Sequence, residues 1–423
     1  MFRNNFIPIK NEHMVTALAA LAAFSTYLCF YPFRRAYTAA TYEDLYYWGV
    51  HYKILIITAQ VLGFAISKGI GVKIVSEMQP KNRARSLLFI TALSCVFMVL
   101  FAIVPPPYNL IFVLLASLPL GLFYGIILGF LEGRQVTDML VAALTASFIV
   151  GSGFAKSIGN WLLNTWQISE FWMPAVADAI MFIPLCISVW LLAKIPPPNS
   201  VDISERIERI PMNKADRRSF VNQFRPGLYM FIASYVLLTA YREYRDNFAP
   251  EILKELGFAE QASLFTKTEI PIAVLVLIIM GSMRWVKNSK IAFNIIQYIM
   301  LAGGAIVFGS TLLFQAELIQ PIYWLISAGF GVYIAYSMCN SLYFERMLSH
   351  FKQKGNVGFL ITLADFFAYF GSIAMLYYKN FYHKNTSNLE FFIFVSYGIA
   401  TIYFMMVLLS FIYYHQKSKS YNL

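Results

Sequence analysis

The sequence predicts an all-α membrane protein in which about twelve transmembrane helices form two six-helix bundles around a central cavity. The composition supports this fold class, because 59% of the 423 residues are hydrophobic, 13% are charged and the mean hydropathy is +0.60. Soluble domains contain less apolar and more charged sequence. Two further observations are a series of apolar runs, each about 20 residues long as a spanning helix requires, and one polar segment near the middle of the chain.

The apolar runs form two groups of six expected spans. The first group lies near 14–41, 50–74, 86–105, 109–131, 139–163 and 171–193. The second group lies near 227–249, 262–284, 291–313, 320–343, 356–378 and 389–414. Between them, a proline run and mixed charge are typical of a solvated linker. We therefore expect an N-terminal bundle over 1–193, a cytoplasmic linker over 194–226 and a C-terminal bundle over 227–423.

The distribution of basic residues predicts the orientation. The chain has 33 Lys and Arg against 22 Asp and Glu, a formal net charge of +11. If the N-terminus is cytoplasmic, 22 Lys and Arg outside the spans lie on the cytoplasmic side, and only four lie on the other side: Lys53, Lys254, Lys379 and Lys384. This asymmetry follows the positive-inside rule and requires an even number of spans with both termini in the cytoplasm. The basic excess thus indicates topology rather than nucleic-acid binding, and we expect a multi-pass protein of the bacterial inner membrane.

No motif in the sequence indicates nucleotide-driven pumping, metal binding or catalysis. The chain contains no P-loop, nucleotide fingerprint, zinc-binding HExxH or nucleophile elbow. Cys29, Cys95, Cys186 and Cys339 lie singly within expected spans, without the spacing of a metal site or a disulfide framework. We therefore expect no enzymatic activity, no cofactor and no metal, and we interpret the cysteines as packing residues.

Charged residues lie within the expected spans, where charge is expensive. The basic ones are Arg34, Arg35, Lys68, Lys156, Arg242, Arg245 and Lys267. The acidic ones are Glu269 and Asp365, together with Glu243 and Asp246 beside the arginines of span seven. A charge at the bilayer centre costs about 2.5 to 3.5 kcal/mol on insertion scales, so it usually faces a cavity or a partner. A net positive cavity would select an anion, whereas some of these side chains could instead snorkel to the interface.

Equivalent spans of the two halves each end with an acidic residue and a nearby basic residue. Span four ends with Glu132 and Arg134, and span ten ends with Glu345 and Arg346. Two parallel six-helix halves leave a weak internal repeat of this kind. We interpret these four residues as gating charge pairs at the cytoplasmic ends of the spans.

Three short segments carry a more specific pattern. They are Tyr31-Pro32-Phe33-Arg34-Arg35-Ala36-Tyr37 in span one, Gly63-Phe64-Ala65-Ile66-Ser67-Lys68 in span two, and Tyr241-Arg242 followed by Phe248-Ala249-Pro250 in span seven. These segments resemble those of the organophosphate:phosphate antiporters of the major facilitator superfamily. The resemblance implies that Arg34 and Arg242 clamp a substrate phosphate, with Lys68 on the same wall of the cavity, while the two halves rock about the substrate.

The sequence departs from that family in two places, which leaves the substrate class open. Span five contains no histidine, and Val75-Ser76-Glu77-Met78-Gln79-Pro80 stands where the family has Gly-x-x-x-Asp-Arg. We expect Lys156 to supply the missing cation, with Arg35, Tyr31 and Tyr241 completing the substrate-binding group. An uncharacterised bacterial offshoot of the superfamily would fit these departures equally well.

The leading functional hypothesis is a secondary active transporter of a small organic anion, with or without a phosphate group. Transport would be driven by phosphate exchange or by protons, with Glu269, Asp365, Lys267 and Arg245 in coupling or ion-pairing roles. The alternative is a receptor with a transporter fold, whose output surface would be the 194–226 segment. A membrane-embedded enzyme has no supporting constellation. The expected partners are the anionic substrate and the lipid bilayer, and we expect a monomer.

Overall fold

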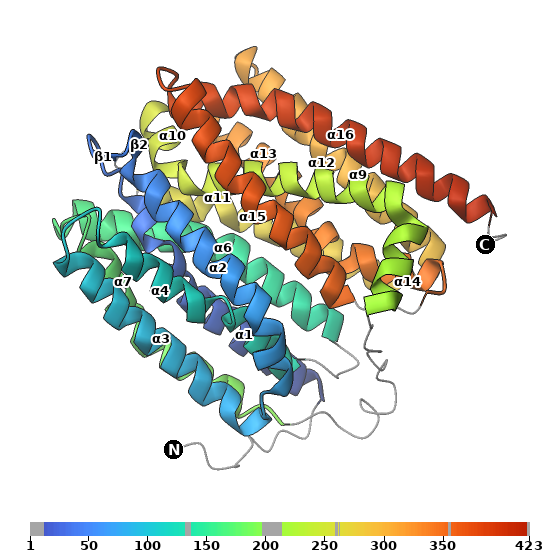
Figure 1. The fold of residues 1–423 in the computed structure, drawn as a ribbon, viewed down its shortest axis with the longest axis horizontal. Coiled ribbons are helices and arrows are strands. Elements are labelled where there is room, and N and C mark those ends of the chain that lie inside the picture. Colours follow the sequence, from blue (N-terminus) through green and yellow to red (C-terminus); the bar gives the residue numbers. More distant parts are fainter. Residues whose placement is uncertain are drawn as a thin grey trace. The chain divides into compact units, whose positions relative to one another are not determined.

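The computed structural model describes residues 12–131, 137–196, 214–258, 261, 263–353 and 357–420. Nearly all of them are helical, which confirms the all-α prediction (Figure 1). The only strands among the described residues are β1 (Tyr46–Tyr47) and β2 (Val50–His51), which pair antiparallel. Their connection uses Trp48 at φ +54° and Gly49 at φ +74°, because a two-residue hairpin loop of this kind needs two left-handed residues.

The described helices pack into two compact units. Unit 1 contains residues 1–206 and 247–273, and unit 2 contains residues 207–246 and 274–423. In unit 1 the helices are α1 (Glu12–Arg35), η1 (Ala36–Ala39), α2 (Tyr52–Glu77), α3 (Pro80–Ile103), α4 (Leu110–Leu120), α5 (Phe123–Leu131), α6 (Thr137–Asn164), α7 (Met173–Ala193), α10 (Ala249–Glu255) and the first half of α11 (Leu264–Ser282). Within this unit α1 packs along α6 and α7, and α3 packs along α4 and α7.

Unit 2 begins, among the described residues, with the long helix α9 (Lys214–Asn247). It continues with the second half of α11, η2 (Met283–Trp285), α12 (Ser289–Gln315), α13 (Pro321–Ser337), the π-helix η3 (Met338–Tyr343), α14 (Phe344–His350), α15 (Val357–Tyr382) and α16 (Asn388–Ser420). Within this unit α12 packs along α13 and α16. Of the expected linker, residues 197–213 lie outside the described part of the chain, and α9 already begins at Lys214.

Ten helices of the described chain are long and apolar enough to cross a membrane. They coincide with ten of the expected spans. The other two expected spans, 227–249 and 356–378, fall on α9 and α15, which are long helices that carry charged residues such as Arg242 and Asp365. The protein is therefore a multi-pass membrane protein.

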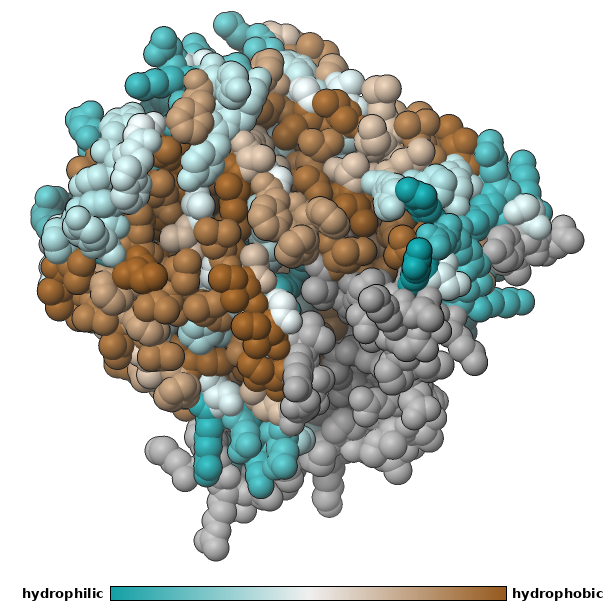
Figure 2. Space-filling view, in the orientation of Figure 1, coloured by the Kyte–Doolittle hydropathy of each residue, from teal (hydrophilic) through white to brown (hydrophobic). Residues whose placement is uncertain are grey.

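Large apolar side chains cover broad areas of the surface. Phe89 of α3, Ile183 of α7 and Ile278 of α11 are 68%, 68% and 61% exposed. Figure 2 shows wide hydrophobic areas on the face drawn, with hydrophilic groups gathered toward its margins. A soluble monomer rarely exposes apolar patches of this extent, whereas lipid tails solvate them without cost.

Helices α12 and α13 approach each other closely at a pair of glycines. A Cβ atom on Gly303 would lie 2.5 Å from the carbonyl oxygen of Gly331, and one on Gly331 would lie 2.6 Å from that of Gly303. Small residues allow such backbone contact between helices in a membrane, where packing replaces the hydrophobic effect as the driving force. Gly309 lies on the same helix, and a Cβ there would meet nothing within 4 Å.

This geometry predicts opposite effects of one substitution at two positions of α12. Gly303→Ala should lower the thermal unfolding temperature in detergent, because the two helices must separate to admit the methyl group. Gly309→Ala should leave it unchanged or raise it, since alanine is a better helix former than glycine by about 1 kcal/mol. Equal losses at both positions would contradict the close α12–α13 contact.

Candidate functional site

The end of α1 gathers the first group of charged side chains in unit 1. Arg34 is half-buried, and its guanidinium carbon lies 4.5 Å from the ring centroid of Phe64 on α2 and 5.9 Å from that of Tyr31. Gln60 donates a hydrogen bond to the carbonyl of Arg34 at 2.8 Å and accepts one from the Tyr37 hydroxyl at 2.5 Å. The aromatic faces stabilise the cation, and Gln60 fixes the backbone at the point where α1 gives way to η1.

Arg35 lies inside unit 1, with 2% of its surface exposed. Its Nη1 atom donates a hydrogen bond to Oδ1 of Asn247, the last residue of α9 and the first residue that packs with unit 1 again. A snorkelling position is excluded for Arg35, since a buried guanidinium cannot reach the headgroups.

Helix α6 packs against Tyr31 and Glu269 at two glycines and also carries the buried Lys156. A Cβ on Gly151 would lie 2.6 Å from Cδ2 of Tyr31, and a Cβ on Gly153 would lie 2.9 Å from Cγ of Glu269 on α11. Lys156, three residues after Gly153, is 1% exposed, and Glu269 is 3% exposed. Residues three apart share a helix face, so Lys156 and Glu269 occupy the same region of the α6 surface.

The two other lysines of the predicted group are less enclosed. Lys68 of α2 is half-buried, next to Ser67, which lies against Gly121 at the end of α4. Lys267 of α11 is exposed, while its neighbours Thr268 and Glu269 are buried. Lys267 therefore points away from the packed face that carries Glu269.

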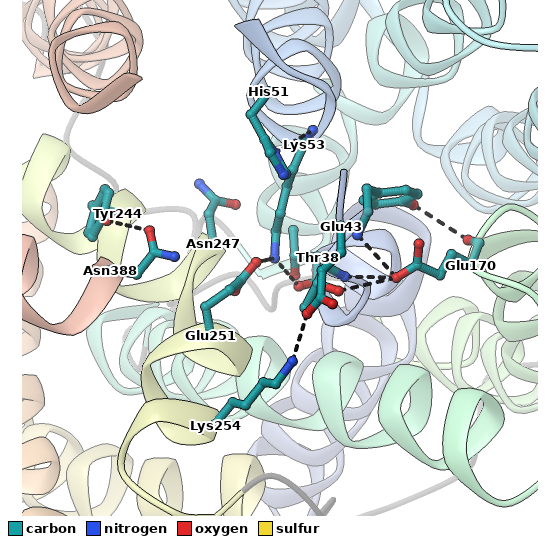
Figure 3. Close-up of polar contacts among 12 residues, drawn as sticks. Thr38, Glu43, His51, Lys53, Glu170, Tyr244, Asn247, Glu251, Lys254 and Asn388 are labelled. Carbon is teal, nitrogen blue, oxygen red and sulfur yellow. Dashed lines mark hydrogen bonds and ion pairs between the residues drawn. The ribbon is translucent and has the colours of Figure 1, made fainter. Parts of the chain in front are cut away.

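A buried ion pair joins α2 to α10 and contacts the backbone of η1. Lys53 is fully buried, and its Nζ atom lies 2.5 Å from Oε1 of Glu251 and 3.0 Å from the carbonyl oxygen of Thr38 (Figure 3). Burial raises the pKa of Glu251, and the Lys53 ammonium opposes that shift. The sequence reasoning counted Lys53 as a loop residue, because charge pairing with a segment almost 200 residues away leaves no local signal.

A second ion pair beside the first is exposed. Nζ of Lys254 lies 2.7 Å from Oε1 of Glu43, with 58% and 62% of the two side chains exposed (Figure 3). The hydrogen bond from Lys254 lowers the pKa of Glu43, and the Glu43 carboxylate raises that of Lys254. Both pairs involve α10, so they offer a comparison between a buried and an exposed charge pair at one helix.

In unit 2 the end of α9 carries Arg242 in an acidic and aromatic surrounding. Arg242 is 9% exposed, its Nη2 atom lies 2.5 Å from Oε1 of Glu243, and its guanidinium carbon lies 3.9 Å from the ring centroid of Tyr336 on α13. The Nε atom of Arg242 is buried and donates no hydrogen bond to any described residue. The guanidinium therefore retains a buried donor after its ion pair has formed.

One turn further along α9, Arg245 and Asp246 form a second buried pair. Nη1 of Arg245 lies 3.5 Å from Oδ1 of Asp246, and Nη2 donates to the carbonyl of Leu325 at 3.3 Å. The hydroxyl of Tyr333 donates to Asp246 at 2.9 Å, and the Tyr333 ring lies 5.8 Å from the Arg245 guanidinium. These contacts hold Arg245 against α13 inside unit 2.

The predicted residues Asp365 and Tyr241 have partners on other helices. Oδ1 of Asp365 on α15 accepts a hydrogen bond from Tyr235 at 2.7 Å, and the Tyr235 ring stacks on Tyr336 at 5.6 Å. Tyr336 thus connects Asp365, through Tyr235, with Arg242. The hydroxyl of Tyr241 shares a hydrogen bond of 2.9 Å with Ser396 on α16, a contact that ties α9 to α16.

The predicted gating residues are described only in part. Glu132 and Arg134 lie outside the described residues. On α14, Glu345 is exposed and Arg346 is half-buried. Arg34 belongs to unit 1 and Arg242 to unit 2, so the clamp that they would form stays a prediction.

The sequence reasoning missed the two tyrosines of α13 that line the arginines of α9. Tyr333 and Tyr336 stand three residues apart, which places them on one helix face. That spacing was visible in the sequence, but aromatic residues at helical spacing usually indicate ordinary packing. The π-helix η3 begins two residues after Tyr336, and such segments are frequent at functional sites.

The fold of the chain is similar to that of two solved transporter structures. The chain is similar to the structure of the nucleoside transporter NupG, with a TM-score of 0.62 and 12% identity over 95% of this chain and 98% of that one. It is also similar to a bacterial homologue of the human drug peptide transporters PepT1 and PepT2, with a TM-score of 0.62 and 11% identity over 96% and 99% of the two chains. No curated protein matches the chain. The model of the family of unknown function DUF5690 matches residues 36–417, and the chain belongs to this family.

The two ion pairs of α10 predict a large and a small effect of the same chemical change. Glu251→Gln leaves the Lys53 ammonium buried without a carboxylate, which should cost about 3 to 5 kcal/mol of stability. Glu43→Gln breaks an exposed pair and should cost at most about 1 kcal/mol. Thermal unfolding of the purified variants measures both.

A double variant separates the charge from the shape of the site. Lys53→Met combined with Glu251→Gln should recover part of the loss of Glu251→Gln, since no buried charge remains. If Glu251→Gln and Glu43→Gln lowered the unfolding temperature equally, the Lys53–Glu251 pair would not be a buried contact.

Proposed function

We propose that this protein is a secondary active transporter that moves a small organic anion by alternating access. The observation that carries the proposal is Arg242, a nine-tenths buried guanidinium with an Nε donor that no described residue uses. A buried cation with a remaining donor is an expensive arrangement, and a bound anion would offset its cost. The major facilitator fold is compatible with this role, because its relatives of known structure include transporters.

Basic side chains within unit 1 support the same interpretation. Arg34, Arg35 and Lys156 are buried or half-buried on α1 and α6, and Glu269 is the acidic residue on the face that carries Lys156. Guanidinium groups bind carboxylate and phosphate oxygens through paired N–H donors, so this group favours an anion over a cation. That Arg34 and Arg242 act on one substrate is part of the proposal and rests on the resemblance of their local sequences to the organophosphate:phosphate antiporters.

The Glu243 carboxylate would compete with a bound anion for Arg242. It occupies Nη2 of Arg242 at 2.5 Å, so an anion that takes both N–H groups of the fork must displace it or share the cation. The energy of substrate binding would then depend on how Glu243 is accommodated in each conformation, and such a differential affinity is what shifts a conformational equilibrium. Phosphate exchange and proton coupling are both compatible with this competition.

The proposal extends to topology and assembly. We propose a bacterial inner-membrane location, both termini in the cytoplasm, two bundles over 1–193 and 227–423 joined by the segment 194–226, and a monomer. The alternative role, a receptor with a transporter fold, differs in one measurable respect. A receptor binds its anion without moving it across the membrane, so uptake by proteoliposomes of the purified protein decides between the two.

The charge-preserving substitution Arg242→Lys is the sharpest test of the anion site. Lysine keeps the positive charge but lacks the planar fork, so the affinity for inorganic phosphate, a sugar phosphate or a dicarboxylate should fall at least about tenfold while folding is preserved. The measurement is the stabilisation of the purified protein by each of these probes, since a ligand stabilises in proportion to its occupancy. Uptake of the same probes into proteoliposomes should fall in parallel.

Arg225→Lys is the matched control on the same helix. Arg225 is exposed on α9, 5.4 Å from the ring of Tyr229, so its replacement should change neither probe affinity nor uptake. If Arg242→Lys kept normal probe affinity, or if joint neutralisation of Arg242 and Glu243 restored normal affinity and uptake, Arg242 would be a structural ion pair rather than a substrate contact.

A further inference from the structure

One carboxyl group in unit 1 is enclosed by protein and has no partner. Asp178 lies on the second turn of α7, which packs along α3, as Figure 1 shows, and along α1. It is 1% exposed, and neither of its two carboxylate oxygens accepts a hydrogen bond from any described residue. Among the described carboxylates, Asp178 is the one whose two oxygens are both buried and unpartnered.

No described residue forms an ion pair or a hydrogen bond with the Asp178 carboxyl group. Helix α7 packs against α1, α3, α6 and η1, and the Cys95 thiol on α3 lies in electrostatic range of Asp178. Ser94, the residue before Cys95, is fully buried, and its hydroxyl has no hydrogen-bond partner among the described residues. By contrast, Asp365 accepts a hydrogen bond from Tyr235, and Glu243 and Asp246 each face an arginine.

This environment decides the charge of the group. An ionised carboxylate without a cation or a hydrogen-bond donor is far more costly in a low-dielectric interior than a neutral carboxylic acid. The neutral acid also carries its own O–H donor. A group in this position therefore holds a proton and can release it only when water or a cation reaches the α3–α7 contact.

We propose that Asp178 is a proton-binding site, with a carboxyl group that is protonated in this packing and becomes a carboxylate by releasing H⁺ when the packing opens. This proposal rests on the proposed transport function and deepens it by naming H⁺ as the coupled ion and Asp178 as its carrier in unit 1. A metal cation fits the site less well, because hard cations take about six oxygen ligands and Asp178 offers one carboxylate.

Infrared spectroscopy of the purified protein tests the proton site without any transported substrate. At neutral pH the wild type should show the C=O stretching band of a protonated carboxylic acid, and Asp178→Asn, a neutral replacement of the same shape, should lose intensity there. Asp44→Asn is the matched control: Asp44 is an exposed loop residue, so its loss should not change the band.

A measurement on the wild type guards against misfolding of the Asn variant. In denaturant at the same pH the band should disappear, because an exposed aspartate has a pKa of about 3.9 and is ionised at neutral pH. A native wild type without the band, or an Asp178→Asn protein with an unchanged band, would overturn the proton site.

Proteoliposomes test the use of the proton. With inorganic phosphate, a sugar phosphate and a dicarboxylate as probes, an imposed pH gradient should stimulate uptake by the wild type. Asp178→Asn should lose this stimulation and retain exchange of the probe at equal concentrations on both sides. Unchanged stimulation in Asp178→Asn, or stimulation by a sodium gradient instead, would overturn Asp178 as the coupling carrier. A wild type that moves none of the probes would count against the proposed transport function alone, since the infrared result decides the proton site independently.

Discussion

Lipid offers no hydrogen bonds and little dielectric screening, so every charge that this chain buries must find its partner inside the protein. The backbone meets that constraint by remaining helical through the described spans. The side chains meet it by pairing: Lys53 with Glu251, Arg242 with Glu243 and Arg245 with Asp246. Breaking such a pair is costly, because it leaves a buried ammonium or guanidinium without its carboxylate.

The buried pairs differ in how far apart their members lie in the chain, and this difference has a physical consequence. Arg242–Glu243 and Arg245–Asp246 join neighbouring residues of α9, so they persist through any motion that keeps the helix intact. Lys53–Glu251 joins α2 to α10, so it exists only while those two segments are in contact. The first kind of pair can hold a charge ready for a ligand, whereas the second holds two segments together.

Asp178 is a buried carboxyl group that has neither a cation nor a hydrogen-bond donor as a partner among the described residues. The proposed proton neutralises this carboxyl group and so avoids the cost of burying a charge, a role that basic side chains fill elsewhere in the chain. The charge of Asp178 therefore depends on the packing around it. Arg242 presents the complementary case, a paired cation that keeps one buried donor. Together they give the protein one group suited to an anion and one suited to a proton, as the proposed coupled transport requires.

Composition and periodicity were sufficient for the fold class. Runs of apolar residues predict spanning helices because lipid leaves the backbone no other stable form, and all ten apolar spans of the structure coincide with predicted ones. Sequence reasoning also singled out Arg35, Lys156, Arg242 and Glu269, because charge within an apolar run is unusual wherever the chain folds. It could not find the partners that decide what those charges do.

The tertiary structure decided the placement of Tyr336 against Arg242, the burial of Lys53 with Glu251, and the isolation of Asp178 between α7 and α3. These contacts depend on which helix faces meet, and the sequence of one helix does not show which residues of another helix pack against it. The hydropathy of this chain therefore determined that it spans a membrane, while the packing of its helices decided which of its buried charges are neutralised and which remain available.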